Sequence, residues 1–203
     1  MCGVMELLPI VHGMTMAKLF YVIGASGAGK DSLIDYCREN LPDTAPVLFA
    51  HRYITQPANA GGENHVALTE QEFLQRRQQG CFTMNWFSHN THYGIGSEID
   101  TWLAKEFNVV VNGSREYLPE AAEKYTNLAP ILITADPDLL ADRLFARGRE
   151  TFQQVSQRVS HAIKLADAVQ HPNLQKVENN GTLEEAGEGL LQLILDREQE
   201  QCA

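Results

Sequence analysis

Residues 18–33 read KLFYVIGASGAGKDSL, and this stretch decides the fold. It opens with a short apolar run that ends in glycine, which is typical of a buried strand in a parallel sheet. Its last part begins a helix near Lys30. The apolar residues that share one face of this helix are Leu33, Ile34, Cys37 and Leu41. A strand, a glycine-rich turn and a helix are therefore expected in direct succession.

The turn fits the pattern G-x-x-x-x-G-K of a phosphate-binding loop. Its backbone N–H groups would surround phosphate oxygens at the positive end of the helix, and the Lys30 ammonium can reach the β- and γ-phosphates of a nucleotide. The glycines permit a backbone approach that a Cβ would hinder. The predicted nucleotide site consists of Gly24, Ala25, Ser26, Gly27, Ala28, Gly29, Lys30, Asp31 and Ser32.

Asp31 departs from this pattern, because a Ser or Thr that binds Mg²⁺ usually follows the lysine. An aspartate in the first turn of a helix is also favourable with the helix dipole. However, a carboxylate facing a triphosphate is repelled unless a cation lies between them. We therefore expect Asp31 to help hold the Mg²⁺ of the bound nucleotide, directly or through water, with Ser32 as the alternative ligand.

The rest of the chain alternates between apolar runs and helical patterns, which predicts an α/β fold with a parallel sheet flanked by helices. The apolar face of the helix expected at 152–169 comprises Phe152, Val155, Val159, Ile163 and Ala166. Residues 54–95 are polar and weakly periodic, and we expect them to form an inserted subdomain. The remaining strands are expected at 46–53, 108–113, 130–135 and 174–181, and the remaining helices at 136–148, 152–169 and 183–198.

Composition limits the class of protein. A net charge of −10 and a pI near 5.1 argue against a nucleic-acid or membrane-surface partner. No apolar run approaches the roughly 18 residues of a membrane span. The four cysteines are widely spaced, which disfavours zinc sites and disulfides and indicates a cytoplasmic protein. Nothing in the sequence sets the oligomeric state.

Two segments stand out from this acidic background. Residues 1–16 lack the basic start of a secretory signal, so we expect a disordered N-terminal extension before a single domain at 17–198. Arginines cluster between 143 and 158, which suggests capture of a small polyanion, although a solvated helix face is the simpler alternative. These arginines are Arg143, Arg147, Arg149 and Arg158.

Four motifs occur in the order of the guanylate kinase-like group: GASGAGKDSL (24–33), RYITQPANAGGENHVALTEQEF (52–73), NTHYGI (90–95) and RLFARGRETFQQVSQRV (143–159). The combination of GKDS, RYITQPA and GGENH is narrower. It most resembles the ribose 1,5-bisphosphate phosphokinases of phosphonate catabolism, over nearly everything from Ala17 to about residue 196. The resemblance implies a P-loop kinase with an acceptor-binding insertion at 54–95 and a helical lid at 143–158.

Several site residues follow from this resemblance. Lys30 matches the loop lysine, Arg52 an acceptor-binding arginine, and Tyr93 the tyrosine that touches the acceptor's phosphate. Arg143, Arg147 and Arg149 match the lid region, and Arg158 matches an arginine at the far side of the transferred phosphoryl. We expect Arg143 to bind substrate, and the catalytic residues to be Lys30, Arg147, Arg149 and Arg158. Glu63 and His65 of GGENH either contact the acceptor or belong to an ordinary turn. His89 and His92 have the spacing of a metal pair but are more simply loop residues.

Two departures separate the chain from guanylate kinases. Thr55 stands where a second arginine is expected, and no carboxylate falls near Met84 or Asn85 to read guanine. The implied reaction is Mg²⁺-dependent transfer from ATP to ribose 1,5-bisphosphate, forming 5-phospho-α-ribosyl 1-diphosphate (PRPP). A phosphate acceptor needs no strong general base, and none is evident. The alternatives are a nucleoside monophosphate kinase of altered base specificity and a non-catalytic guanylate kinase-like interaction module.

Overall fold

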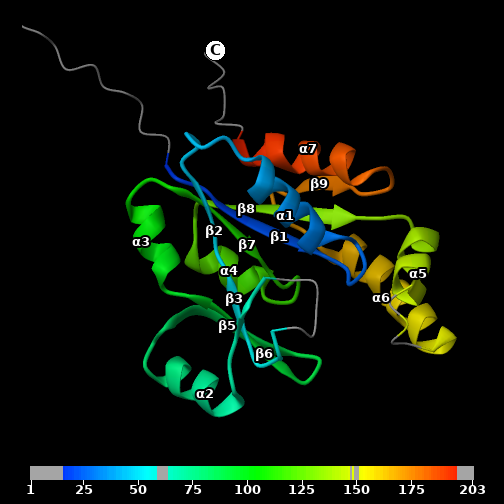
Figure 1. The fold of residues 1–203 in the computed structure, drawn as a ribbon, viewed down its shortest axis with the longest axis horizontal. Helices are drawn as coiled ribbons and strands as arrows, with labels where there is room; N and C mark the ends of the chain where they lie inside the picture. The colour runs from blue at the N-terminus through cyan, green and yellow to red at the C-terminus, as the bar shows by residue number, and fades with distance from the viewer. Residues whose placement is uncertain (1–15, 59–63, 147, 149–150, 196–203) are drawn as a thin grey trace, which may run out of the picture.

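The computed structural model describes residues 16–58, 64–146, 148 and 151–195 (Figure 1). Its centre is a five-stranded sheet in which every pairing is parallel, with strand order β2-β7-β1-β8-β9. This confirms the α/β fold that the alternating pattern predicts. The strands span Val47–Phe49 (β2), Asn108–Asn112 (β7), Leu19–Gly24 (β1), Leu128–Thr134 (β8) and Gln175–Glu178 (β9).

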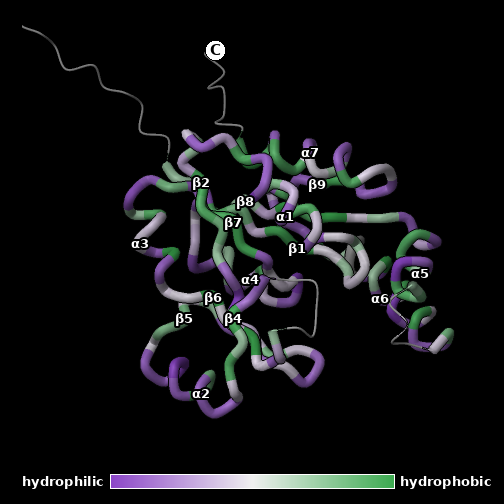
Figure 2. Tube along the Cα trace, viewed as in Figure 1, coloured by the Kyte–Doolittle hydropathy of each residue, from purple (hydrophilic) through white to green (hydrophobic). Residues whose placement is uncertain are grey.

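Both faces of the sheet are buried because β1 alternates its apolar side chains between two cores. Phe20 and Val22 pack with α1 (Lys30–Asn40) and α7 (Leu183–Leu195). Tyr21 and Ile23 pack with α3 (Glu98–Ala104) and α4 (Leu118–Lys124) on the other face. Figure 2 shows the hydrophobic residues concentrated on the central strands. Because all five strands run in parallel, their carboxyl ends share one edge of the sheet, and this edge carries the phosphate loop.

A second sheet lies to one side of the first, with strand order β4-β3-β6-β5 (Figure 1). Its strands are β3 (Arg52–Ile54), β4 (Val66–Ala67), β5 (Phe82–Ser88) and β6 (Thr91–Gly96), and α2 (Glu70–Gln78) connects β4 to β5. Met84 and Ile95 extend from this sheet into the core beside α3, so the two sheets share a hydrophobic core. The segment expected as an insertion at 54–95 thus forms a small sheet with one helix.

The predicted strand at 46–53 is two strands in two different sheets. Ala50 and His51 separate them, and the Ala50 N–H donates to the Val110 carbonyl at 2.9 Å before the chain turns away into β3. The helices α2, α3 and α4 were not predicted from the sequence. Each is short, and α2 depends on the Thr69 side chain, which caps it by accepting from the Glu72 N–H.

Two helices extend beyond the carboxyl edge of the parallel sheet: α5 (Pro137–Ala146) and α6 (Phe152–Ala168) (Figure 1). Thr151 and Gln154 form a capping box at the start of α6. The expected apolar face of α6 is wrong at two positions, because Phe152 is 77% exposed and Ile163 is 43% exposed. Phe152 instead stacks on Phe145 of α5, and α6 buries Val155 and Ala162.

Three expectations fall outside the described residues: the disordered extension, apart from Met16, the segment around Glu63, and the lid residues Arg147 and Arg149. Within the part of the chain that is described, every helix is too short or too polar to cross a bilayer.

Candidate active site

The phosphate loop joins β1 to α1 with two glycines in the left-handed region. Gly27 and Gly29 have φ angles of 89° and 90°, which residues with a Cβ rarely adopt. At Gly29 a Cβ would lie 2.3 Å from Nδ2 of Asn179, so the position also lacks space. Lys30 Nζ bends back over the loop and donates to the carbonyls of Gly24 and Ala25 at 3.1 and 3.2 Å. The ammonium therefore lies over the turn where a phosphate chain would bind.

Asn179, which directly follows β9, holds this loop through a side-chain hydrogen bond. Its buried Nδ2 donates to the Ala28 carbonyl at 2.8 Å across 151 residues of sequence. The backbone carbonyl of Asn179 accepts a hydrogen bond from Nη2 of Arg143 at 3.0 Å. Asn179 thus links the loop to α5. It was missed from the sequence, where the pair Asn179-Asn180 after a predicted strand was the available signal.

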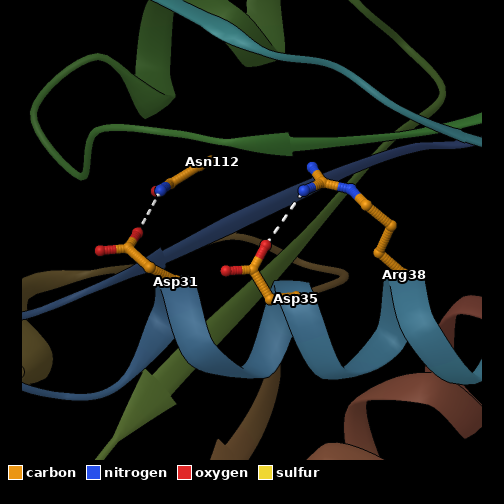
Figure 3. A network of polar contacts seen from close by, with 4 residues as sticks. All are labelled: Asp31, Asp35, Arg38 and Asn112. Carbon is orange, nitrogen blue, oxygen red and sulfur yellow. Dashed lines mark hydrogen bonds and ion pairs between the residues drawn. The ribbon is translucent and has the colours of Figure 1, made fainter. Parts of the chain in front are cut away.

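Asp31 contacts the end of β7 rather than only its own helix. Nδ2 of Asn112 donates to Asp31 Oδ1 at 2.7 Å (Figure 3). Asn112 is only 6% exposed, and its Oδ1 has no hydrogen-bond partner. A buried carbonyl oxygen without a donor is costly, so this atom is suited to a ligand that supplies positive charge. Asn112 was also missed; its place at the end of the buried run 108–113 was the signal.

A second polar pair follows one turn further along α1. Nη1 of Arg38 donates to Asp35 Oδ1 at 3.0 Å (Figure 3). Burial raises the pKa of the Asp35 carboxyl above its ordinary value, although Arg38 acts in the opposite direction. Asp31, Asp35 and Arg38 share one side of α1 and line a cavity of about 20 Å³ together with Asn64 and Asn112.

The oxygen atoms in this region fit Mg²⁺. Mg²⁺ is typically held by one or two carboxylates, with water and substrate phosphates completing its shell. Asp31 keeps one oxygen that Asn112 does not occupy, and the unpartnered Asn112 Oδ1 is a second hard donor at the same edge. Ser32 lies exposed at the next position of α1. In the described residues no group of three or more His, Cys, Asp or Glu side chains could hold a metal alone. Phosphate oxygens would therefore have to complete the coordination.

The four-stranded sheet brings two further predicted residues together. The guanidinium of Arg52 on β3 lies 5.1 Å from the ring centroid of Tyr93 on β6. Trp86 stacks on the same tyrosine, with a distance of 5.6 Å between the ring centroids. His65 Nε2 lies 3.2 Å from the Gln56 carbonyl. Arg52 and Tyr93 therefore meet as the resemblance implies, while Glu63 lies outside the described residues.

The departures from the guanylate kinase pattern have structural consequences. Thr55 Oγ1 accepts from the His92 N–H at 2.9 Å, so this residue fastens β3 to β6 where an arginine was expected. Met84 is fully buried in the core and cannot face a ligand. The His92 ring packs on Phe73 and Phe87 and lies 3.7 Å from Glu70. These contacts favour the reading of His92 as a structural residue.

The lid arginines occupy different places. Arg143 donates to Asn179 and has a buried Nη1 without a partner. Arg158 reaches from α6 to the phosphate loop, where Nη1 lies 3.4 Å from Ser26 Oγ. Arg147 and Arg149 lie outside the described residues. Two of the four arginines are therefore placed against the loop and its support.

Comparison with known proteins identifies the group. No family model matches the chain. The ribose 1,5-bisphosphate phosphokinase PhnN of Thiobacillus denitrificans is 54% identical over 185 residues, which cover 90% of this chain and 95% of that protein. The protein of the same name from Psychromonas ingrahamii is 51% identical over 177 residues, which cover 87% and 89% respectively.

A solved guanylate kinase from Anaplasma phagocytophilum matches with a TM-score of 0.68 at 13% identity, over 93% of this chain and 89% of that one. At that identity the match shows a shared fold, and the expected guanylate kinase-like fold is confirmed. The narrower resemblance drawn from the motifs is confirmed by the sequence relatives. The chain belongs to the family of ribose 1,5-bisphosphate phosphokinases named PhnN.

Proposed function

We propose that this chain transfers the γ-phosphoryl group of ATP to the 1-phosphate of ribose 1,5-bisphosphate and forms PRPP. Identity of 54% across nearly the whole length of a ribose 1,5-bisphosphate phosphokinase carries the proposal. We place the reaction in the cytoplasm, where ATP is available and an exposed thiol such as Cys81 stays reduced.

On the donor side, the loop amides and Lys30 hold the β- and γ-phosphates. Asp31 and Asn112 hold Mg²⁺ at the end of β7, directly or through water, and Ser32 is the alternative ligand. Mg²⁺ bound there would neutralise charge on the phosphate oxygens. Supporting this assignment, the Asn112–Asp31 hydrogen bond orients the carboxylate and leaves the Asn112 carbonyl oxygen without a partner.

On the acceptor side, the four-stranded sheet binds the phosphorylated sugar. Arg52 and Tyr93 contact a phosphate of the acceptor, and we assign His65 and Glu63 to acceptor binding as well. An arginine held against a tyrosine ring keeps its fork of donors in one orientation, which suits bidentate contact with phosphate. The acceptor oxygen belongs to a phosphate monoester, which is already anionic, so these residues need only position it.

The lid at 143–158 closes over the transferring group. Arg143 and Arg158 already touch Asn179 and Ser26, and we assign Arg147 and Arg149 to the same task. Closure would exclude water and limit hydrolysis of ATP.

Guanylate kinase activity is the second candidate, because the solved guanylate kinase shares the fold. The residues Met84 and Asn85 disfavour it, since the Met84 side chain packs in the core and Asn85 offers an amide in place of the carboxylate that reads guanine.

An acceptor panel tests the proposal. Purified protein with Mg-ATP is given ribose 1,5-bisphosphate, ribose 5-phosphate, GMP, AMP, CMP or UMP, and products are identified by mass spectrometry. We expect a diphosphate product only from ribose 1,5-bisphosphate. Phosphorylation of a nucleotide alone would overturn the substrate assignment, and no transfer to any acceptor would favour the interaction module.

A further inference from the structure

Arg115 is a partly buried cation that the site described so far does not use. It lies three residues beyond Asn112, in the loop that follows β7. Its Nη1 is buried and donates to no hydrogen-bond partner. Burial lowers the pKa of the guanidinium, and the adjacent Glu116 offsets this only in part. A desolvated arginine without a paired anion is an unfavourable arrangement in a ligand-free protein.

The loop that carries Arg115 is held in place on both sides. Asn112 donates to Asp31 as described above. The Ser114 N–H donates to the buried Tyr21 hydroxyl at 3.0 Å, and that hydroxyl lies 3.1 Å from the Ser114 carbonyl. Gly113 allows this approach, since a Cβ there would lie 2.2 Å from the Tyr21 ring. Arg115 therefore projects from a fixed turn rather than from a free loop.

Arg115 borders a cavity of about 230 Å³ between the phosphate loop, the end of β8 and the lid helices. Other residues that line it are Ala25 and Ala28 of the loop, Thr134 at the end of β8, Leu140 of α5 and Ala162 of α6. These side chains are apolar apart from Thr134, and they supply no carboxylate. The cavity lining gives the guanidinium no counter-charge, and Glu116 offsets its charge only in part, so an anion entering the cavity would be attracted to Arg115.

We propose that Arg115 contacts the phosphoryl group as it passes from ATP to the acceptor, a role that rests on the proposed kinase reaction. The positions of the neighbouring groups support it: the cavity adjoins the loop that holds the donor phosphates and the helices that form the lid. Asn112, at the other end of the same turn, serves the Mg²⁺ side. Bidentate N–H donors aimed at a pentacovalent phosphoryl group would stabilise its equatorial oxygens.

The test compares Arg115→Met with Arg115→Lys and with Arg77→Met, which removes an exposed arginine from α2. We expect Arg115→Met to lower kcat/KM about 100-fold, and Arg115→Lys to lower it about tenfold because the forked donor is lost. The melting temperature of ligand-free Arg115→Met should equal or exceed that of the wild type, since an unpaired buried charge is removed. Arg77→Met should leave both quantities unchanged.

Binding of phosphate probes separates this inference from the identity of the acceptor. With Mg²⁺ present, Arg115→Met should bind tripolyphosphate about tenfold more weakly than the wild type and ADP equally well, because only the third phosphate reaches Arg115. An equal loss for both probes, or no loss for either, overturns the inference even if ribose 1,5-bisphosphate is the acceptor. A destabilised Arg115→Met variant that keeps wild-type kcat/KM per folded molecule also overturns it, and assigns Arg115 a structural role. If Arg115→Met does not fold, the same two probes are applied to Arg115→Lys, with the same deciding outcomes.

Discussion

The carboxyl edge of the parallel sheet and the four-stranded sheet organise their polar groups differently. At the first, short hydrogen bonds join residues far apart in sequence, from Asn112 to Asp31 and from Asn179 to Ala28. At the second, Arg52 rests on the Tyr93 ring, and Trp86 stacks on that same tyrosine. Hydrogen bonds fix direction to within a narrow range, whereas ring stacking tolerates small displacements.

This difference indicates separate functions for the two halves of the site, the donor edge and the four-stranded sheet. The donor edge holds groups in one geometry, as a metal and a triphosphate require. The small sheet offers the Arg52 guanidinium oriented on the Tyr93 ring, which suits bidentate contact with a phosphate of the acceptor. Substitutions in the first region should therefore change turnover and Mg²⁺ dependence, and substitutions in the second should change the KM for the acceptor.

The largest effect is expected for Lys30→Met. Removing the ammonium that lies over the loop should lower kcat/KM roughly 1,000-fold, because it removes a charge aimed at the transferring phosphates. Steady-state kinetics with varied ATP measure this loss. Lys176→Met, an exposed lysine on β9, is the control and should stay within about twofold of the wild type. A loss below tenfold for Lys30→Met would remove the loop lysine from the mechanism.

Next in size are the changes at the proposed metal site. Asp31→Ser and Asn112→Ala should each raise the Mg²⁺ concentration for half-maximal activity by roughly 10- to 100-fold, because Asp31 supplies a ligand and Asn112 both orients it and offers a second oxygen. The effect of the double variant should be smaller than the two single effects combined, since one hydrogen bond couples the two residues.

Mg²⁺ titrations at saturating ATP measure this dependence. Asp138→Asn, in the exposed first turn of α5, is the matched control and should leave it unchanged. If Asp31→Ser titrates like the wild type, the carboxylate has no part in holding the metal.

A smaller effect is expected in the four-stranded sheet. Tyr93→Leu should raise the KM for ribose 1,5-bisphosphate about tenfold, because Arg52 loses the ring that orients it. The KM for ATP should not change. Phe87→Leu, at an exposed aromatic residue of the neighbouring β5, is the control. Equal changes in both KM values would show that the two regions are not separable in the way the contacts indicate.

The last comparison is between the reactivities of two thiols, Cys37 on α1 and Cys81 next to the four-stranded sheet. Burial raises the pKa of Cys37 on α1 to about 12, whereas Cys81 at the start of the small sheet is exposed. In a background where Cys2 and Cys202 are Ser, a thiol reagent at pH 8 should label Cys81 rapidly and Cys37 only on unfolding. Rapid labelling of both would mean that the helix opens locally.

Cys37 also makes stability depend on pH in the alkaline range. The folded state holds the thiol proton more tightly than the unfolded chain, whose thiol titrates near pH 9. The stabilisation is therefore complete below pH 9 and is lost as the pH rises toward 12. Urea unfolding across this range should show a fall that is smaller in Cys37→Ala, and identical slopes in the two proteins would contradict the assignment.

Local patterns were sufficient where one segment carries all the information. The strand, turn and helix at 18–33 follow from an apolar run, three glycines and a helical periodicity, and each was found where expected. Strands β7 and β8 were likewise recognisable, because buried parallel strands are continuous apolar runs. Strand β9 lies within the expected range 174–181, although only Val177 of it is buried. Local patterns failed at β2 and β3, where one run of residues divides between two sheets, and at α6, where Phe152 meets Phe145 instead of the core.

The sequence by itself determined the fold class, the phosphate loop and the family, since these depend on residue spacing within short segments. Only the tertiary structure decided which polar groups meet at the carboxyl edge. Asn112 ends β7, Arg115 lies in the loop after it, and Asn179 directly follows β9. None of these short stretches shows on its own that the three residues meet beside the phosphate loop. Parallel strands bring such residues together because all their carboxyl ends face the same side of the sheet, whatever their distance along the chain.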